Sequence, residues 1–205
     1  NYNDALADFT RALEIDTKWA WLFAQRAETY RQLSRYPEAL ADFNRAIELN
    51  KDYDWAIAQR GETYRIMGKY PEALADFDRA LELDEKNTWA LLRRGQTYRQ
   101  MGKYSEALAD YNRVLEIEAS NVDALAGRGE TYRLMGKYPE ALADFNRAIE
   151  LDEKYTRAIA SRGQTYYQMG EFAKALTDLD RAIELNATMG WAIALRGETY
   201  RLMGK

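Results

Sequence analysis

The strongest constraint on this chain is a periodicity of 34 residues. The segment YPEALADFNRAIELNKDYDWAIAQRGETYRIMGK begins at Tyr36, and divergent copies begin at Tyr2 and Phe172. Closer copies begin at Tyr70, Tyr104 and Tyr138. A short repeat of this kind cannot bury its apolar face alone and has to stack on its neighbours. Such units fill residues 2–205, so we expect one array without a linker or a second domain.

Each unit predicts two helices. From Pro37 to Leu49, apolar residues recur at spacings of three and four, which is typical of one buried helical face. Pro37 is placed where a first helical turn tolerates proline. A second helix is expected from Asp54 to Met67, and Gly68 supplies a left-handed residue that ends it. A short turn then makes the two helices an antiparallel hairpin.

The amino-acid composition limits the kinds of catalytic, metal-binding and partner-binding sites that the chain can form. The chain has 205 residues, 47% of them hydrophobic and 30% charged, with a net charge of −4 and neither Cys nor His. Thiolate sites, disulfides and histidine-based catalysis or metal binding are therefore excluded. We expect no metal, no cofactor and no enzymatic activity. The acidic balance argues against nucleic acid as a partner, because such binders usually carry a basic footprint.

No apolar run is long enough to cross a bilayer, and the polar start Asn1-Tyr2-Asn3-Asp4 does not resemble a signal peptide. We therefore expect a cytoplasmic protein that makes no membrane contact.

The repeated residues resemble the tetratricopeptide repeat. Gly61 and Tyr64 on one helix, with Ala73, Phe77 and Ala80 on the next, match its pattern at the same period. The resemblance covers essentially the whole chain and is closest in kind to regular bacterial-type or consensus, engineered arrays. It implies an all-α fold, a right-handed superhelical α-solenoid of antiparallel hairpins with about 12 helices.

The resemblance also implies the order of the helices, and the chain departs from the family pattern at two positions. The large aromatic residue expected four positions before the first-helix glycine is aliphatic in most repeats, for example Ile57 and Leu91. The proline expected near each repeat end is replaced, for example by Lys51 and Glu85, which affects the turn geometry and the superhelix pitch. The implied order makes 1–19 a second helix alone and 190–205 a first helix alone. The expected full repeats are 20–53, 54–87, 88–121, 122–155 and 156–189.

One arginine and one aspartate recur in every unit. In an antiparallel hairpin they lie opposite each other at the seam, which is the buried interface between the two helices. An arginine there needs a carboxylate partner. We predict five structural ion pairs: Arg26–Asp42, Arg60–Asp76, Arg94–Asp110, Arg128–Asp144 and Arg162–Asp178. The nearby run Gly127-Arg128-Gly129 lacks the third glycine and the preceding strand of a dinucleotide-binding fingerprint, so we assign it no function.

A binding surface is expected on the first helix of each repeat, where stacked units form a concave groove. Residues spaced by 3, 7 and 10 from Trp55 share this face. The groove candidates are Trp21, Trp55, Trp89, Trp191, Glu28, Glu62, Gln96, Glu130, Arg31, Arg65, Arg99, Arg133, Arg157 and Tyr167. Exposed Trp beside Arg is typical of protein interfaces.

Alternatives to the groove remain open. The tryptophans could instead cap the next repeat, and pairs such as Glu62–Arg65 could be solvated partners of small value. Interruptions at Asp123, Gly127, Arg157 and Tyr167 mark the least regular part of the groove, where specificity could reside.

The main functional hypothesis is a non-catalytic scaffold that binds an extended or helical peptide in the concave groove. The alternative is head-to-tail self-assembly through terminal helices that keep an apolar face, or an engineered scaffold without a ligand of its own.

Overall fold

The computed structural model describes residues 1–204, which contain twelve α-helices and no strand. They divide into two compact units, residues 1–101 and the described residues from 102 onward. The first unit holds α1 (Tyr2–Ile15), α2 (Ala20–Gln32), α3 (Tyr36–Leu49), α4 (Asp54–Ile66), α5 (Tyr70–Leu83) and α6 (Thr88–Gln100). The second holds α7 (Tyr104–Ile117), α8 (Val122–Leu134), α9 (Tyr138–Leu151), α10 (Thr156–Gln168), α11 (Phe172–Leu185) and α12 (Gly190–Leu202).

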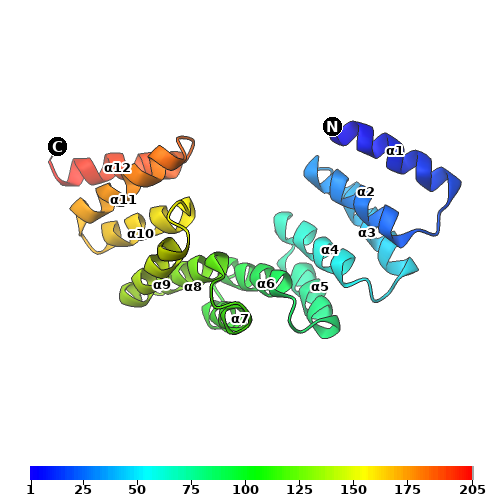
Figure 1. The fold of residues 1–205 in the computed structure, drawn as a ribbon, viewed down its shortest axis with the longest axis horizontal. Helices are drawn as coiled ribbons and strands as arrows, with labels where there is room; N and C mark the ends of the chain where they lie inside the picture. Colours follow the sequence, from blue (N-terminus) through cyan, green and yellow to red (C-terminus); the bar gives the residue numbers. More distant parts are fainter. Residues whose placement is uncertain (205) are drawn as a thin grey trace. The chain divides into compact units, whose positions relative to one another are not determined.

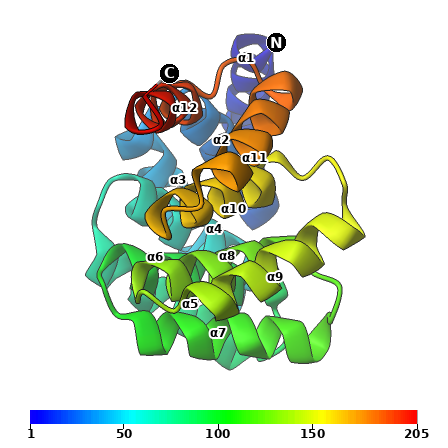
Figure 2. The same ribbon diagram turned by 90° about the vertical axis from the view of Figure 1, so that its left-hand side faces the viewer.

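Consecutive helices form the hairpins that the sequence predicts. In the first unit α2 packs on α3 and α4 on α5, and in the second α8 packs on α9 and α10 on α11 (Figures 1 and 2). The hairpins need a small residue at their crossing. A Cβ added at Gly61 would lie 3.1 Å from Phe77 Cε1 and 3.2 Å from the Ala73 carbonyl oxygen, so glycine permits this close approach.

One residue with a left-handed backbone conformation ends the first helix of each hairpin and allows the turn. Gly68 has a φ of 74°, its N–H donates to the Arg65 carbonyl at 3.0 Å, and the Lys69 N–H donates to the Tyr64 carbonyl at 2.9 Å. These two bonds satisfy carbonyls that the helix end would otherwise leave unpaired. Ser34 takes the same place in the first hairpin with a φ of 59°.

Within each unit the first helices of successive repeats touch one another. α4 contacts both α2 and α6, and α10 contacts both α8 and α12, whereas α3 and α5 make no such contact in the described residues. The first helices therefore form an inner layer and the second helices an outer layer. The side chains predicted to line a groove lie on the inner layer.

The core lies between these layers. Phe43, Phe77, Phe145 and Leu179 are fully buried at the same position of successive outer helices, surrounded by buried alanines. None of the described helices has the length and apolar character needed to cross a membrane.

Candidate functional site

The repeated arginine and aspartate meet at the seam of each hairpin. Arg26 donates from Nε to Asp42 Oδ2 at 2.6 Å and from Nη2 to Asp42 Oδ1 at 2.8 Å. The same two-bond geometry joins Arg60 to Asp76, Arg128 to Asp144 and Arg162 to Asp178. Hydrogen bonding to the paired carboxylate raises the pKa of each of these four arginines. A bidentate pair of this kind fixes geometry as well as charge.

The fifth predicted pair, Arg94–Asp110, has one member in each unit and stays a prediction. Within the first unit, Arg94 Nη1 donates to Asp78 Oδ1 at 2.7 Å.

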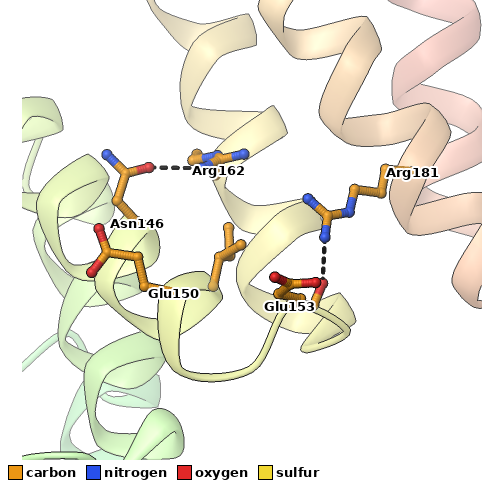
Figure 3. A pocket seen from close by; sticks show the side chains of 6 residues that line it. Asn146, Glu150, Glu153, Arg162 and Arg181 are labelled. Atoms are coloured by element: carbon orange, nitrogen blue, oxygen red, sulfur yellow. Dashed lines mark hydrogen bonds between the residues drawn. The ribbon is translucent and has the colours of Figure 1, made fainter.

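The Arg94–Asp78 bond belongs to a second set of contacts, which the sequence pattern does not predict. The remaining guanidinium nitrogen of the repeated arginine reaches back to the preceding repeat. Arg60 Nη1 donates to Asn44 Oδ1 at 2.7 Å, and Arg162 Nη1 donates to Asn146 Oδ1 at 2.7 Å. Figure 3 shows the Arg162–Asn146 bond beside a cavity of about 500 Å³. The repeated Asn or Asp two positions after the seam aspartate was the available signal.

This cavity lies among α9, α10 and α11, away from the predicted groove residues. It is lined by Asn146, Ile149, Glu150, Glu153, Arg162 and Arg181. Its arginines are already engaged, because Arg162 binds Asp178 and Arg181 Nη2 donates to the Glu153 carbonyl oxygen at 2.6 Å (Figure 3). The arrangement is a junction between repeats and offers no free cation to a ligand.

On the inner layer, glutamate and arginine three residues apart form ion pairs. Glu62 accepts from Arg65 Nε at 2.7 Å and from Nη2 at 2.8 Å, and the two side chains are only 7% and 12% exposed. Glu28 and Arg31 pair in the same way, also largely covered. The interpretation of these pairs as solvated is therefore wrong for the first unit, because neighbouring inner helices cover them.

The Glu130–Arg133 pair of the second unit has a different geometry. Arg133 Nη2 lies 3.5 Å from Glu130 Oε1, and Arg133 Nη1 donates to Gln168 Oε1 of the next repeat at 3.3 Å. An equivalent bond joins Arg65 Nη1 to Gln100 at 3.2 Å. The sequence pattern does not predict these contacts of Gln100 and Gln168, because the two side chains face the neighbouring inner helix only once the repeats are stacked.

The tryptophans of the inner layer divide by burial. Trp21 and Trp191 are 55% and 47% exposed. The half-buried Trp55 and Trp89 pack edge-on against Phe43 and Phe77 of the preceding outer helices, with ring centroids 6.5 and 6.3 Å apart. These two rings therefore contact the preceding repeat, a packing that neither interpretation of the tryptophans anticipated.

A cavity of about 310 Å³ lies on α4 and α6 between Trp55 and Trp89. Its lining comprises Asp54, Trp55, Ala58, Gln59, Asn87 and Trp89. Beside it, Arg93 lies 5.2 Å from the centroid of the Trp89 ring and donates from Nη1 to Gln96 Oε1 at 3.2 Å. Arg99 lies on the same helix, one turn beyond Gln96, and is half-buried. The cavity brings two of the predicted tryptophans together.

In the second unit two interruptions of the groove, Asp123 and Arg157, form a polar cluster with Glu130. Arg157 Nη2 donates to Glu130 Oε2 at 3.3 Å, and Arg157 Nη1 lies 3.9 Å from Asp123 Oδ1. Tyr155 donates to Asp123, and burial together with this bond raises the pKa of Tyr155. Tyr167 packs against Phe172 with ring centroids 6.0 Å apart, which places it at the hairpin turn.

Comparison with known proteins agrees with this architecture. The tetratricopeptide repeat family profile matches residues 18–86, 54–120, 89–154 and 120–188. No curated protein matches the chain.

Several solved structures share the fold. YrrB, described as a tetratricopeptide repeat protein with an unusual peptide-binding site, is 25% identical, with a TM-score of 0.67 over 92% of this chain and 97% of that one. A tetratricopeptide repeat protein from Parabacteroides merdae is 27% identical, with a TM-score of 0.78 over 97% and 77% of the two chains. The pilus biogenesis factor PilW, at 16% identity, has a TM-score of 0.84 over 90% and 86% and shows likeness of fold alone. The stacked hairpins, the repeated seam residues and the family profile together establish that this chain belongs to the tetratricopeptide repeat family.

Proposed function

We propose that this protein is a non-catalytic scaffold that binds an extended or helical peptide along the inner helices. Tetratricopeptide repeats generally mediate interactions between proteins. The observation that carries the proposal is the cavity between Trp55 and Trp89, which combines aromatic surface with a few polar groups. Sites that bind ligands are usually concave, with aromatic walls and a small number of placed polar side chains.

Polar side chains farther along the inner helices, outside the lining of the cavity, support the same proposal. Glu62 holds Arg65 by two hydrogen bonds, and Gln100 of the next repeat accepts a third. A side chain held in one geometry loses little conformational entropy when a ligand binds, so a pre-formed surface gains affinity. The structurally similar YrrB is described as having a peptide-binding site, which makes a peptide the first ligand class to test.

The experiment is a selection of peptides from a displayed random library on the full chain, followed by fluorescence anisotropy with the enriched peptides. We expect the double variant Trp55→Ala, Trp89→Ala to weaken binding at least tenfold, because truncating central aromatic residues commonly costs more than about 1.4 kcal/mol. Trp19→Ala is the matched control, because Trp19 precedes α2 and does not line the cavity. Equal losses for both variants, or no enriched peptide, would contradict the proposal.

A second candidate, self-association, is favoured by complementary faces on α12 and α1. A Cβ added at Gly197 would meet no atom of the described residues within 4 Å, unlike the Cβ at Gly61. Arg196 binds Asp180 of the preceding outer helix at 2.8 Å, but no described residue supplies its seam aspartate. On α1, Asp8 and Phe9 occupy the seam positions, and Asp8 makes no ion pair within residues 1–204. We propose that α1 of a second copy could pack on α12 as an outer helix packs in each internal hairpin.

Sedimentation velocity over a wide concentration range tests this candidate. Self-association should give species that grow with concentration, and Asp8→Arg should abolish them by placing two cations at the seam. Asp4→Arg makes the same charge change in the exposed first turn of α1 and should leave association intact. A monomer at every concentration would eliminate self-association and leave the peptide scaffold.

A further inference from the structure

The side chains that line the Trp55–Trp89 cavity are apolar, acidic or neutral and polar. Among residues 1–204, its lining contains two indoles, one carboxylate and two amides, and neither a lysine nor an arginine. Its volume of about 310 Å³ lies at the lower end of the roughly 300–1,000 Å³ typical of ligand pockets, so it suits one side chain rather than a helix. The Asn87 amide oxygen is already used, because it accepts from the Ala90 N–H at 3.0 Å.

Gln59 gives the second observation. Its side chain lines the cavity and the residue is only 8% exposed, yet its Oε1 accepts no hydrogen bond from the part of the chain that the structure describes. A buried acceptor without a donor carries an unfavourable desolvation cost. A ligand that brings an N–H group into the cavity would remove this cost.

A ligand group that satisfies the whole lining must be apolar along its length and must donate hydrogen bonds at its end. The indole faces favour an aliphatic chain and also attract a cation. The Asp54 carboxylate and the Gln59 oxygen require donors. A leucine would leave both acceptors unpaired, and a glutamate would face a like charge.

We propose that this cavity binds the side chain of an arginine or lysine in a peptide ligand. The aliphatic stem lies against Trp55 and Trp89, and the charged end donates to Asp54 and Gln59. The inference rests on the proposed function, because it assigns a specificity to one segment of the groove.

Arg93 shows that this surface already accommodates a guanidinium. Its guanidinium lies 5.2 Å from the centroid of the Trp89 ring, but the residue does not line the cavity. No arginine or lysine of residues 1–204 lies over the Trp55 ring, so the side of the cavity beside Asp54 is free for a ligand cation. An acidic ligand would have to reach Arg93 instead, which the experiment can distinguish.

The experiment follows the indole N–H signals of the tryptophans by NMR during titration of the full chain. The probe is Nα-acetyl-arginine amide, and the comparison compounds are the corresponding leucine and glutamate amides. We expect the arginine compound to shift the Trp55 and Trp89 signals in a saturable manner and to leave Trp191 unchanged. No saturable shift, an equal response to the leucine compound, or a stronger response to the glutamate compound would overturn the inference.

Two variants test the donor requirement. Asp54→Asn and Gln59→Met should each weaken arginine binding roughly threefold, because each removes one partly exposed contact to the cation and leaves the others in place. Glu72→Gln removes an exposed carboxylate from the first turn of α5 and is the matched control for charge. Arg93→Leu should leave arginine binding intact. Unchanged affinity in both cavity variants, or a loss in Arg93→Leu, would contradict the assignment.

Peptides from the library selection distinguish this inference from the proposed function. Selected peptides that need Trp55 and Trp89 but tolerate replacement of every basic residue would refute the inference and leave the scaffold function intact. Saturable arginine binding without any selected peptide would refute the peptide-binding function and leave the preference of the cavity intact.

Discussion

The repeated arginine joins three helices at once. Arg128 donates two hydrogen bonds to Asp144 in its own hairpin and a third to Asn112 in the preceding repeat at 2.8 Å. A guanidinium carries N–H donors in a fixed planar fork, so one side chain can satisfy partners on two sides. A lysine at this position would lack the geometry for the same three contacts.

Loss of the seam carboxylate should therefore destabilise the protein strongly. Asp144→Ala leaves Arg128 largely covered and without its main partner, which should lower the free energy of unfolding by about 3 kcal/mol. The measurement is thermal and urea denaturation followed by circular dichroism. At a concentration where the protein is monomeric, Asp8→Ala is the matched control, because Asp8 has the equivalent position on α1 but is exposed, and its change should stay within about 0.5 kcal/mol. Similar losses for both variants would show that the aspartate acts through helix propensity rather than through the pair.

Gly127 marks a limit of prediction from sequence. The Gly127-Arg128-Gly129 run has no function by motif, but a Cβ at Gly127 would lie 2.6 Å from Tyr111 Cε1. Tyr111 stands where most other repeats have phenylalanine and is fully buried. The compensation between these two residues depends on how closely α7 approaches α8, which no local pattern contains.

Gly127→Ala should reduce stability by about 2 kcal/mol, because the new methyl group overpacks a buried ring. Gly197→Ala provides the opposite case within the same chain. A Cβ there meets no atom within 4 Å, so alanine should stabilise α12 by about 0.5–1 kcal/mol through helix propensity. Melting temperatures of the two variants, measured side by side, should move in opposite directions. A shift of both in the same direction would refute the steric explanation.

At the scale of the element, the hairpin could be predicted almost completely. Proline in the first turn, apolar spacing of three and four, and a glycine stop are local signals, and they place α5 and the turn before it within a residue or two. The burial of Glu62 and Arg65 could not be predicted in this way. Their spacing is the same as that of exposed pairs, and only the neighbouring inner helix covers them.

The turns make one element-scale prediction. Ser34 adopts a φ of 59°, where glycine stands in the later hairpins, and a side chain there costs about 1–2 kcal/mol. Ser34→Gly should therefore raise the stability of the α2–α3 hairpin by about 1 kcal/mol, measured as increased hydrogen-exchange protection of its amides. Gly68→Ala should lower the protection of the α4–α5 hairpin by a similar amount. Reduced protection in Ser34→Gly would show that the serine side chain stabilises the turn.

At the scale of the whole molecule, stability depends on the interfaces between repeats as much as on each hairpin. An array of this kind unfolds as the sum of its repeat stabilities and nearest-neighbour terms. The arginine bonds to the preceding repeat belong to the nearest-neighbour term. Their acceptor alternates between Asn44, Asn112 and Asn146 on one hand and Asp78 and Asp180 on the other, so the contact requires an oxygen rather than a charge.

Because Asn and Asp replace each other as the acceptor, substitutions at Asn146 test whether this bond couples neighbouring repeats. Asn146→Leu removes the acceptor for Arg162 Nη1 at similar side-chain size, and should cost about 1 kcal/mol, because the bond is exposed and its donor remains accessible to water. The loss should fall on the interface, so the urea transition should broaden and the amides of α10 and α11 should exchange before those of α8. Asn146→Asp keeps the oxygen, as Asp78 and Asp180 do, and should retain both the midpoint and the width of the transition. If Asn146→Leu shifted the midpoint while the width stayed constant, the bond would stabilise one hairpin only and the coupling would have to come from the apolar contacts between the inner helices.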